Sequence, residues 1–112
     1  MRAEELNEHL DALLLAALEG GPRHGYAVIE ALRQDTGGRL DLPTGTIYPA
    51  LRRLEQAGLI TGSWSVVVGR RRRCYRLTEA GQQALAGRRT AWREFAATVS
   101  AVLEGVPCPD LA

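Results

Sequence analysis

The sequence has no lysine, only two cysteines and two histidines, and aromatic residues make up just 5% of its 112 residues. Cys74 and Cys108 are too few for a disulfide framework. The cysteines and histidines also lack the spacing of zinc ligands, so neither a metal nor another cofactor is expected. The longest apolar run, Ala12–Leu18, is far shorter than the roughly 18 residues of a membrane span, so no membrane partner is expected.

Two further absences limit the class of function. The N-terminus is acidic and lacks the apolar core of a signal peptide, which predicts a cytoplasmic protein. No nucleophile elbow and no HExxH motif occurs, and the serines and histidines lie apart along the chain. Since acid–base catalysis needs paired groups, we expect no enzyme. A chain of this length suits one domain with a modest core.

Net positive charge is confined to the middle of the chain, and all 14 basic residues are arginine. Residues 39–76 hold eight arginines and two acidic residues. By contrast, residues 1–38 hold three arginines and seven acidic residues, and residues 77–112 hold three and four. A basic middle between acidic flanks indicates a surface that binds a polyanion at one place.

Hydrophobic spacing predicts three helices in the first half of the chain. Apolar residues recur with helical period over Glu4–Glu19 and again from about His24 to Gln34. The glycine-rich segment Gly20–Gly25 lacks the ending of a phosphate-binding loop and reads as the turn between these helices. A third helix is expected to start at Thr46, because Pro49 then falls in its first turn, where proline is tolerated.

The second half of the chain predicts a hairpin followed by a long helix. Alternating residues over Leu59–Leu77 indicate two strands with a turn at Gly69-Arg70 and a basic tip. Thr78 is the expected cap of a helix from Glu79 to about Glu104, roughly 39 Å long and too long for so small a body to cover. This order predicts a mainly α fold with a small β-hairpin, namely a winged helix-turn-helix plus a long C-terminal dimerisation helix. The expected divisions are residues 1–78 for the winged helix, 79–106 for the dimerisation helix and 107–112 for a tail.

The third helix is the candidate recognition helix for the major groove of DNA. If Ile47, Leu51 and Leu54 are buried, then Tyr48, Arg52 and Gln56 share an exposed face. Hydroxyl groups and arginines are suited to phosphate oxygens and to guanine edges. An ordinary solvated helix face is the alternative interpretation. The predicted DNA-contacting residues of this helix are Thr44, Thr46, Tyr48, Pro49, Arg52 and Arg53.

The run Arg70, Arg71, Arg72 and Arg73 is the strongest charge feature. Alternate strand residues face opposite ways, so Arg71 and Arg73 cannot point where Arg70 and Arg72 point. A wing along a minor groove could insert one arginine and place another on a phosphate. The alternative is a hairpin kept soluble by charge, although such hairpins usually mix the two signs.

Four other residues lie in or beside the predicted basic segments. His24 and Tyr26, at the start of the second helix, are candidates for a further phosphate contact. Trp64 on the hairpin is expected to pack rather than to stack on bases. Cys74 lies among arginines, which leaves a redox role open beside the simpler interpretation of strand packing.

The last helix carries apolar residues spaced by seven, which is typical of a coiled-coil seam. The predicted seam consists of Leu85, Trp92, Val99 and Val106, with Phe95 and Val102 three residues further on. This spacing favours pairing with a second copy of the helix over packing on its own domain. Trp92 and Phe95 could alternatively form a platform for a flat effector, although packing is the simpler interpretation.

Four segments resemble the PadR family of bacterial transcriptional regulators. They are His24-Gly25-Tyr26, Gly45–Glu55, Gly58-Leu59-Ile60 and Tyr75–Gly81. In this order and at this spacing, the resemblance extends over roughly residues 6–104. It implies a homodimeric winged-helix repressor of its own or a neighbouring operon, in the branch with a single C-terminal helix that crosses to the partner subunit.

The resemblance also implies roles for particular residues. The family's recognition helix would correspond to Thr44, Thr46, Tyr48, Arg52 and Arg53, and its wing to Arg70–Arg73. Trp92 stands where multidrug-sensing members carry an aromatic residue in a ligand pocket, so a small aromatic effector is implied. Two-fold symmetry predicts double-stranded DNA with an inverted-repeat operator. A winged-helix module that binds protein or RNA without operator specificity is the alternative function.

Overall fold

The computed structural model describes the backbone of residues 3–105 and the side chains of residues 9–105. This part of the chain folds into four helices and a three-stranded antiparallel sheet in the order β1-β3-β2. The helices are α1 (Ala3–Ala17), α2 (Gly25–Asp35), α3 (Thr44–Gln56) and α4 (Glu79–Leu103), and the strands are β1 (Arg23–His24), β2 (Ile60–Val67) and β3 (Arg70–Leu77). The predicted fold class is confirmed. Val106, Cys108 and the predicted tail lie outside the described residues.

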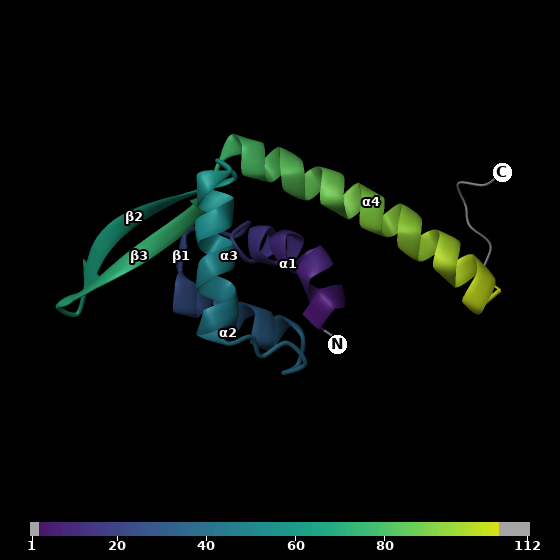
Figure 1. Ribbon diagram of the computed structural model, residues 1–112, viewed down its shortest axis with the longest axis horizontal. Helices are drawn as coiled ribbons and strands as arrows, with labels where there is room; N and C mark the ends of the chain where they lie inside the picture. The colour runs from purple at the N-terminus through teal and green to yellow at the C-terminus, as the bar shows by residue number, and fades with distance from the viewer. Residues whose placement is uncertain (1–2, 106–112) are drawn as a thin grey trace.

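The helices α1, α2 and α3 enclose the core, and the remaining elements extend from it. In Figure 1 the β2–β3 hairpin projects to the left of these helices and α4 projects to the right. The fully buried side chains are Leu14, Leu15, Leu18, Val28, Ile47, Leu51, Leu54 and Ile60. Burial of each such aliphatic side chain contributes about 1.5–3 kcal/mol. The predicted buried face of α3 is confirmed, and Tyr48, Arg52 and Gln56 on another face are exposed.

The first turn of α3 differs from the prediction. The helix begins at Thr44 rather than at Thr46, with Pro43 as its N-cap, which makes no side-chain capping hydrogen bond. The backbone N–H groups of Thr46 and Ile47 both donate to the carbonyl of Pro43, at 3.0 and 3.1 Å. Because these bonds start the helix two residues early, Pro49 lies inside it and removes one helical donor.

The hairpin forms as predicted, but its turn lies one residue earlier. Strands β2 and β3 pair from Ile60↔Leu77 to Val67↔Arg70, so Arg70 opens the return strand. The turn is Val68-Gly69, with φ angles of 52° and 75°. Two positive φ angles are the requirement of the two-residue turn that matches strand twist, and here a β-branched residue adopts one of them. We call this hairpin, residues 60–77, the wing.

Strand β1 was not predicted. Its two residues pair with β3 in the register Arg23↔Tyr75 and His24↔Cys74. Because a strand of two residues has no detectable period, the sequence indicates only a turn in this segment. Through this pairing the start of α2 is held beside the base of the wing.

Helix α4 is anchored at its first turn. Thr78 caps it as predicted, since its hydroxyl oxygen accepts from the N–H of Gly81 at 3.1 Å and donates to the carbonyl of Gly58 at 2.7 Å. The backbone approach is so close that a Cβ at Gly81 would lie 1.9 Å from the carbonyl oxygen of Leu59. A glycine is therefore required where α4 crosses the end of α3.

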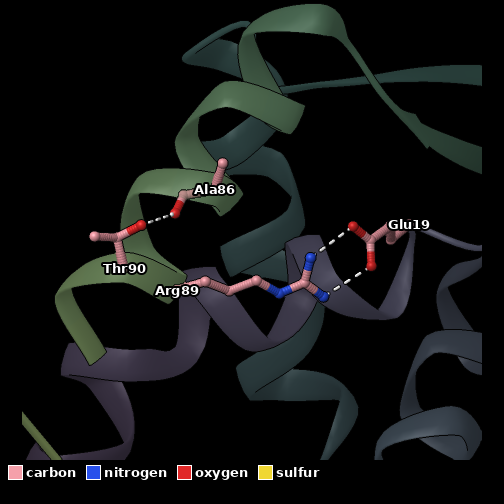
Figure 2. A network of polar contacts seen from close by, with 4 residues as sticks. All are labelled: Glu19, Ala86, Arg89 and Thr90. Atoms are coloured by element: carbon pink, nitrogen blue, oxygen red, sulfur yellow. Dashed lines mark hydrogen bonds and ion pairs between the residues drawn. The ribbon is translucent and has the colours of Figure 1, made fainter. Parts of the chain in front are cut away.

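Further along, α4 contacts α1 before it leaves the body. The guanidinium of Arg89 donates to both carboxylate oxygens of Glu19, and Thr90 bonds back to the carbonyl of Ala86 (Figure 2). Leu85 is only 2% exposed and belongs to the core of its own domain. Its prediction as a seam residue is therefore wrong, because the first turns of α4 still cover the body. Within residues 3–105 no helix is long and apolar enough to span a membrane.

Candidate nucleic-acid interface

A groove of about 930 Å³ lies between α3 and the wing, with the start of α2 at its end. It brings together eight of the twelve residues predicted to contact DNA. These are His24, Tyr26, Tyr48, Arg52, Arg70, Arg71, Arg72 and Arg73. Thr44, Thr46 and Pro49 do not line the groove, although they lie at the N-terminal end of the same helix. Three elements distant in sequence thus form one surface rich in arginine and tyrosine.

Gly25 allows α2 and α3 to meet closely at this surface. A Cβ at Gly25 would lie 2.5 Å from a ring carbon of Tyr48, so the ring occupies the space that a side chain would need. Tyr48 remains 40% exposed, and Tyr26 beside it is 59% exposed. Two phenol groups are therefore available to a ligand at the end of the groove.

Arg52 and Arg53 have different environments although they are adjacent. Arg52 is exposed and lines the groove. Arg53 forms an ion pair with Asp11 of α1 and does not line the groove. Successive helix residues are about 100° apart around the axis, so the two arginines cannot serve the same face. Local spacing did not reveal Asp11 as a partner, because 42 residues separate the pair.

The strand register divides the wing into two faces, as predicted. Arg73 lies directly opposite Trp64 and Arg71 opposite Val66, so these side chains share one face. The Arg71 and Arg73 guanidinium carbons lie 4.6 and 5.3 Å from the centroid of the Trp64 ring. Such cation–π contacts hold the long side chains in place. Trp64 lines the groove and is 59% exposed, so its packing is against arginines rather than in the core.

Glu55 is the one carboxylate among the groove-lining residues, and it was not predicted as a site residue. It forms an ion pair with Arg73 across the groove, and the Nε of Arg73 also donates to Oε1 of Glu55 at 3.4 Å. The hydrogen bond to this carboxylate raises the pKa of the Arg73 guanidinium above its usual value. Arg73 is therefore the one arginine of the four-residue run shown to be paired with a carboxylate of the same chain.

Tyr75 is a buried side chain in the lining of the groove. Tyr75 is 6% exposed, and its burial raises the pKa of the phenol. Cys74 is half-buried opposite His24 in the β1–β3 pair, a position typical of strand packing. Between residues 9 and 105 no three side chains of the metal-binding types cluster closely enough to hold an ion. The groove therefore offers arginine cations and phenol hydroxyls, which are groups that bind phosphate oxygens and base edges.

The second surface of interest is the free part of α4. Trp92 lies edge-on to His9 of α1, with 5.5 Å between their ring centroids. The ring centroids of Trp92 and Phe95 are 6.0 Å apart. The exposed fractions of Trp92, Phe95 and Val102 are 54, 60 and 81%. Val99 is half-buried. His9 was not predicted to take part in this aromatic group.

Comparison with known proteins gives a consistent result. Residues 14–87 match the Transcriptional regulator PadR-like family. The chain is 43% identical to Transcriptional regulator Rv3488 of Mycobacterium tuberculosis over 77 residues, which are 69% of this chain and 59% of that relative's length.

Two solved structures show the same fold. A PadR family transcriptional regulator from Eggerthella lenta DSM 2243 superimposes with a TM-score of 0.77 at 31% identity, covering 90% of this chain and 87% of that one. Bacillus subtilis PadR, solved in complex with operator DNA, gives a TM-score of 0.64 at 26% identity over 70% of this chain and 45% of that one. With its winged-helix body and its family match over most of that body, the chain belongs to the PadR-like family of transcriptional regulators.

Proposed function

We propose that this protein is a homodimeric DNA-binding repressor of its own or a neighbouring operon. The observation that carries the proposal is the convergence of Arg52 and Arg70–Arg72 with two exposed tyrosines on a single groove. Contacts between arginine and phosphate supply most of the DNA affinity of such surfaces. Their attraction is strongest where no carboxylate of the protein lies nearby. The solved complex of Bacillus subtilis PadR with operator DNA supports this choice of ligand.

The two walls of the groove have separate tasks in this proposal. Helix α3 enters the major groove, where Arg52 can pair with a guanine edge and Tyr48 can donate to a phosphate. The wing follows the flanking backbone, and its exposed arginines neutralise phosphates or enter a narrow minor groove. Base reading thus belongs to α3, while most of the charge neutralisation belongs to the wing.

The apolar face of α4 supplies the dimer contact. Trp92, Phe95 and Val102 are exposed on the part of the helix that extends beyond the body. A row of large apolar side chains at sevenfold spacing is stabilised when a second copy of the helix covers it. The two-fold axis then presents two recognition helices to an inverted repeat whose half-sites lie about 10 bp, or a multiple of this, apart.

A small aromatic effector can be accommodated in the same proposal. Trp92, Phe95 and His9 form an exposed aromatic group at the proposed interface, and a flat ligand would stack there. Such a ligand relieves repression only if it binds one arrangement of the two wings more tightly than the other. Trp92 is therefore the residue whose fluorescence should respond to an effector.

Fluorescence anisotropy tests the proposal. The purified protein is titrated into labelled duplex from upstream of its own gene and into a scrambled duplex, at several salt concentrations. We expect tight binding to the native duplex, one dimer per site, with a steep loss of affinity as salt rises. Equal binding to both duplexes would show that the groove binds polyanions without sequence preference. No binding at low salt would favour the alternative of a protein- or RNA-binding module.

A further inference from the structure

The four arginines of the wing are not equivalent. The side chain of Arg73 is 28% exposed, whereas Arg70, Arg71 and Arg72 are exposed. Arg73 contacts both the Glu55 carboxylate and the Trp64 ring, and its guanidinium occupies the space that a side chain at Gly62 would need. It therefore lies in a built pocket rather than in solvent.

Gly62 is the part of this pocket that admits the guanidinium. A Cβ at Gly62 would lie 2.7 Å from Nε of Arg73 and 3.0 Å from its guanidinium carbon. The two residues lie on neighbouring strands and on the same face of the wing, offset by two residues, since Gly62 pairs with Tyr75 and Arg73 pairs with Trp64. With Gly62 on one side and Trp64 on the other, the Arg73 side chain is directed toward α3.

Glu55 is unfavourable for DNA binding if it acts alone. A carboxylate on the recognition helix repels nearby phosphates, and it lines the same groove as Tyr48 and Arg52. Its pairing with Arg73 neutralises that charge and at the same time connects α3 to the wing. Both side chains are 28% exposed, so the pair is partly shielded from solvent and salt.

We propose that Glu55 and Arg73 are positioning residues that fix the angle between the recognition helix and the wing, and that Arg73 is not a phosphate contact. The inference rests on the proposed DNA-binding function. The angle determines the distance between the bases that α3 contacts and the flanking DNA backbone that the wing contacts. The pair therefore acts on the discrimination between native and scrambled DNA more than on the overall electrostatic attraction.

Three variants separate this role from plain phosphate binding. Anisotropy titrations of the full chain at several salt concentrations give the salt slope and the ratio of native to scrambled affinity. For Arg73→Gln we expect an unchanged slope and a ratio at least tenfold lower. For Arg71→Gln we expect the slope of the dimer to fall by about 1.8, since each phosphate contact contributes about 0.9. For Glu55→Gln we expect a lower ratio and a steeper slope, because Arg73 is released toward phosphates.

A charge exchange and a matched control complete the DNA experiment. The double variant Glu55→Arg with Arg73→Glu keeps the net charge and restores the pair, so the ratio should return to within threefold of the original. Glu79→Gln removes an acidic residue of α4 that does not line the groove, and it should leave the ratio unchanged. If Arg73→Gln lowers the slope as Arg71→Gln does, with no change of ratio, Arg73 is a phosphate contact and the inference is wrong.

A second readout needs no DNA. In a Trp92→Phe background, Trp64 is the only tryptophan, and its time-resolved anisotropy reports motion of the wing. We expect Glu55→Gln to increase the amplitude of the fast component of the decay, because the wing then moves more freely relative to the body, and Glu79→Gln to leave it unchanged. An unchanged decay in Glu55→Gln overturns the inference. If the original protein shows no operator preference, the proposed function fails, and this decay alone decides whether the pair holds the wing.

Discussion

The guanidinium of Arg89 donates two hydrogen bonds to the carboxylate of Glu19, at 2.6 and 2.8 Å. The pair joins α4 to the end of α1, 70 residues away in sequence (Figure 2). It is the last ion pair between α4 and the body among the described contacts, and beyond it the helix carries the proposed dimer contact. The pair therefore helps to hold the first half of α4 against the body.

The pair predicts a loss of stability in acid. Hydrogen bonding from Arg89 lowers the pKa of Glu19 below its usual 4.5. The folded state thus favours the ionised carboxylate, and its stabilisation is fully present above pH 4.5 and is lost as the pH falls through the lower folded pKa. We expect Tm to fall less between pH 6 and pH 3 in Glu19→Gln and in Arg89→Gln than in the original protein. Parallel Tm curves for all three proteins would contradict this assignment.

Two glycines of α4 predict opposite effects of the same substitution. A Cβ at Gly81 would overlap the carbonyl oxygen of Leu59, whereas a Cβ at Gly87 would meet no atom within 4 Å. Gly81→Ala should destabilise the fold by about 1–3 kcal/mol through overpacking. Gly87→Ala should stabilise it by roughly 0.5–1 kcal/mol, since alanine loses less backbone entropy in a helix. Urea denaturation measures both, and a similar effect of the two substitutions would show that α4 is not docked at Gly81.

The sequence predicted those parts of the fold that depend on local period. The buried face of α3, the hairpin and the long last helix are all confirmed, because each has enough residues to show its spacing. Strand β1 has only two residues, and the turn at Val68-Gly69 places a valine where asparagine or glycine is usual. The start of α3 depends on bonds to the Pro43 carbonyl, which the position of Pro49 obscured.

The sequence predicted the charged residues of the candidate site but not their ion-pair partners. Residue types alone identified the arginines of α3 and the wing, and eight of the twelve predicted residues line one groove. The partners of Arg53 and Arg73 are 42 and 18 residues away, so only the tertiary fold brings them together. Sevenfold spacing likewise placed Leu85 in the seam, whereas the body of the protein covers that turn of α4.

The two adjacent arginines of α3 predict a clear division between DNA binding and folding. Arg52→Gln should weaken operator binding by about 1–3 kcal/mol and relax the preference at one base pair, if Arg52 pairs with guanine. Arg53→Gln removes the ion pair with Asp11 and should change the free energy of unfolding by less than about 1 kcal/mol, because the Arg53 side chain is 57% exposed and solvent screens the pair. Anisotropy against single-base variants of the operator and urea denaturation measure the two effects. Equal losses of affinity from both substitutions would place Arg53 on the DNA as well.

The exposed face of α4 predicts substitutions that act on assembly alone. Phe95 and Val102 are 60 and 81% exposed, so Phe95→Ser and Val102→Ser remove little from the core of the subunit. Each should raise the dimer dissociation constant at least tenfold in sedimentation equilibrium, because a paired seam would lose about 1.5 kcal/mol or more of apolar burial per subunit. Glu94→Gln is a suitable control, since Glu94 lies two positions from Trp92 and therefore on the other side of the helix. If neither serine variant weakens the dimer, the seam is not the interface, and the predicted half-site spacing loses its basis.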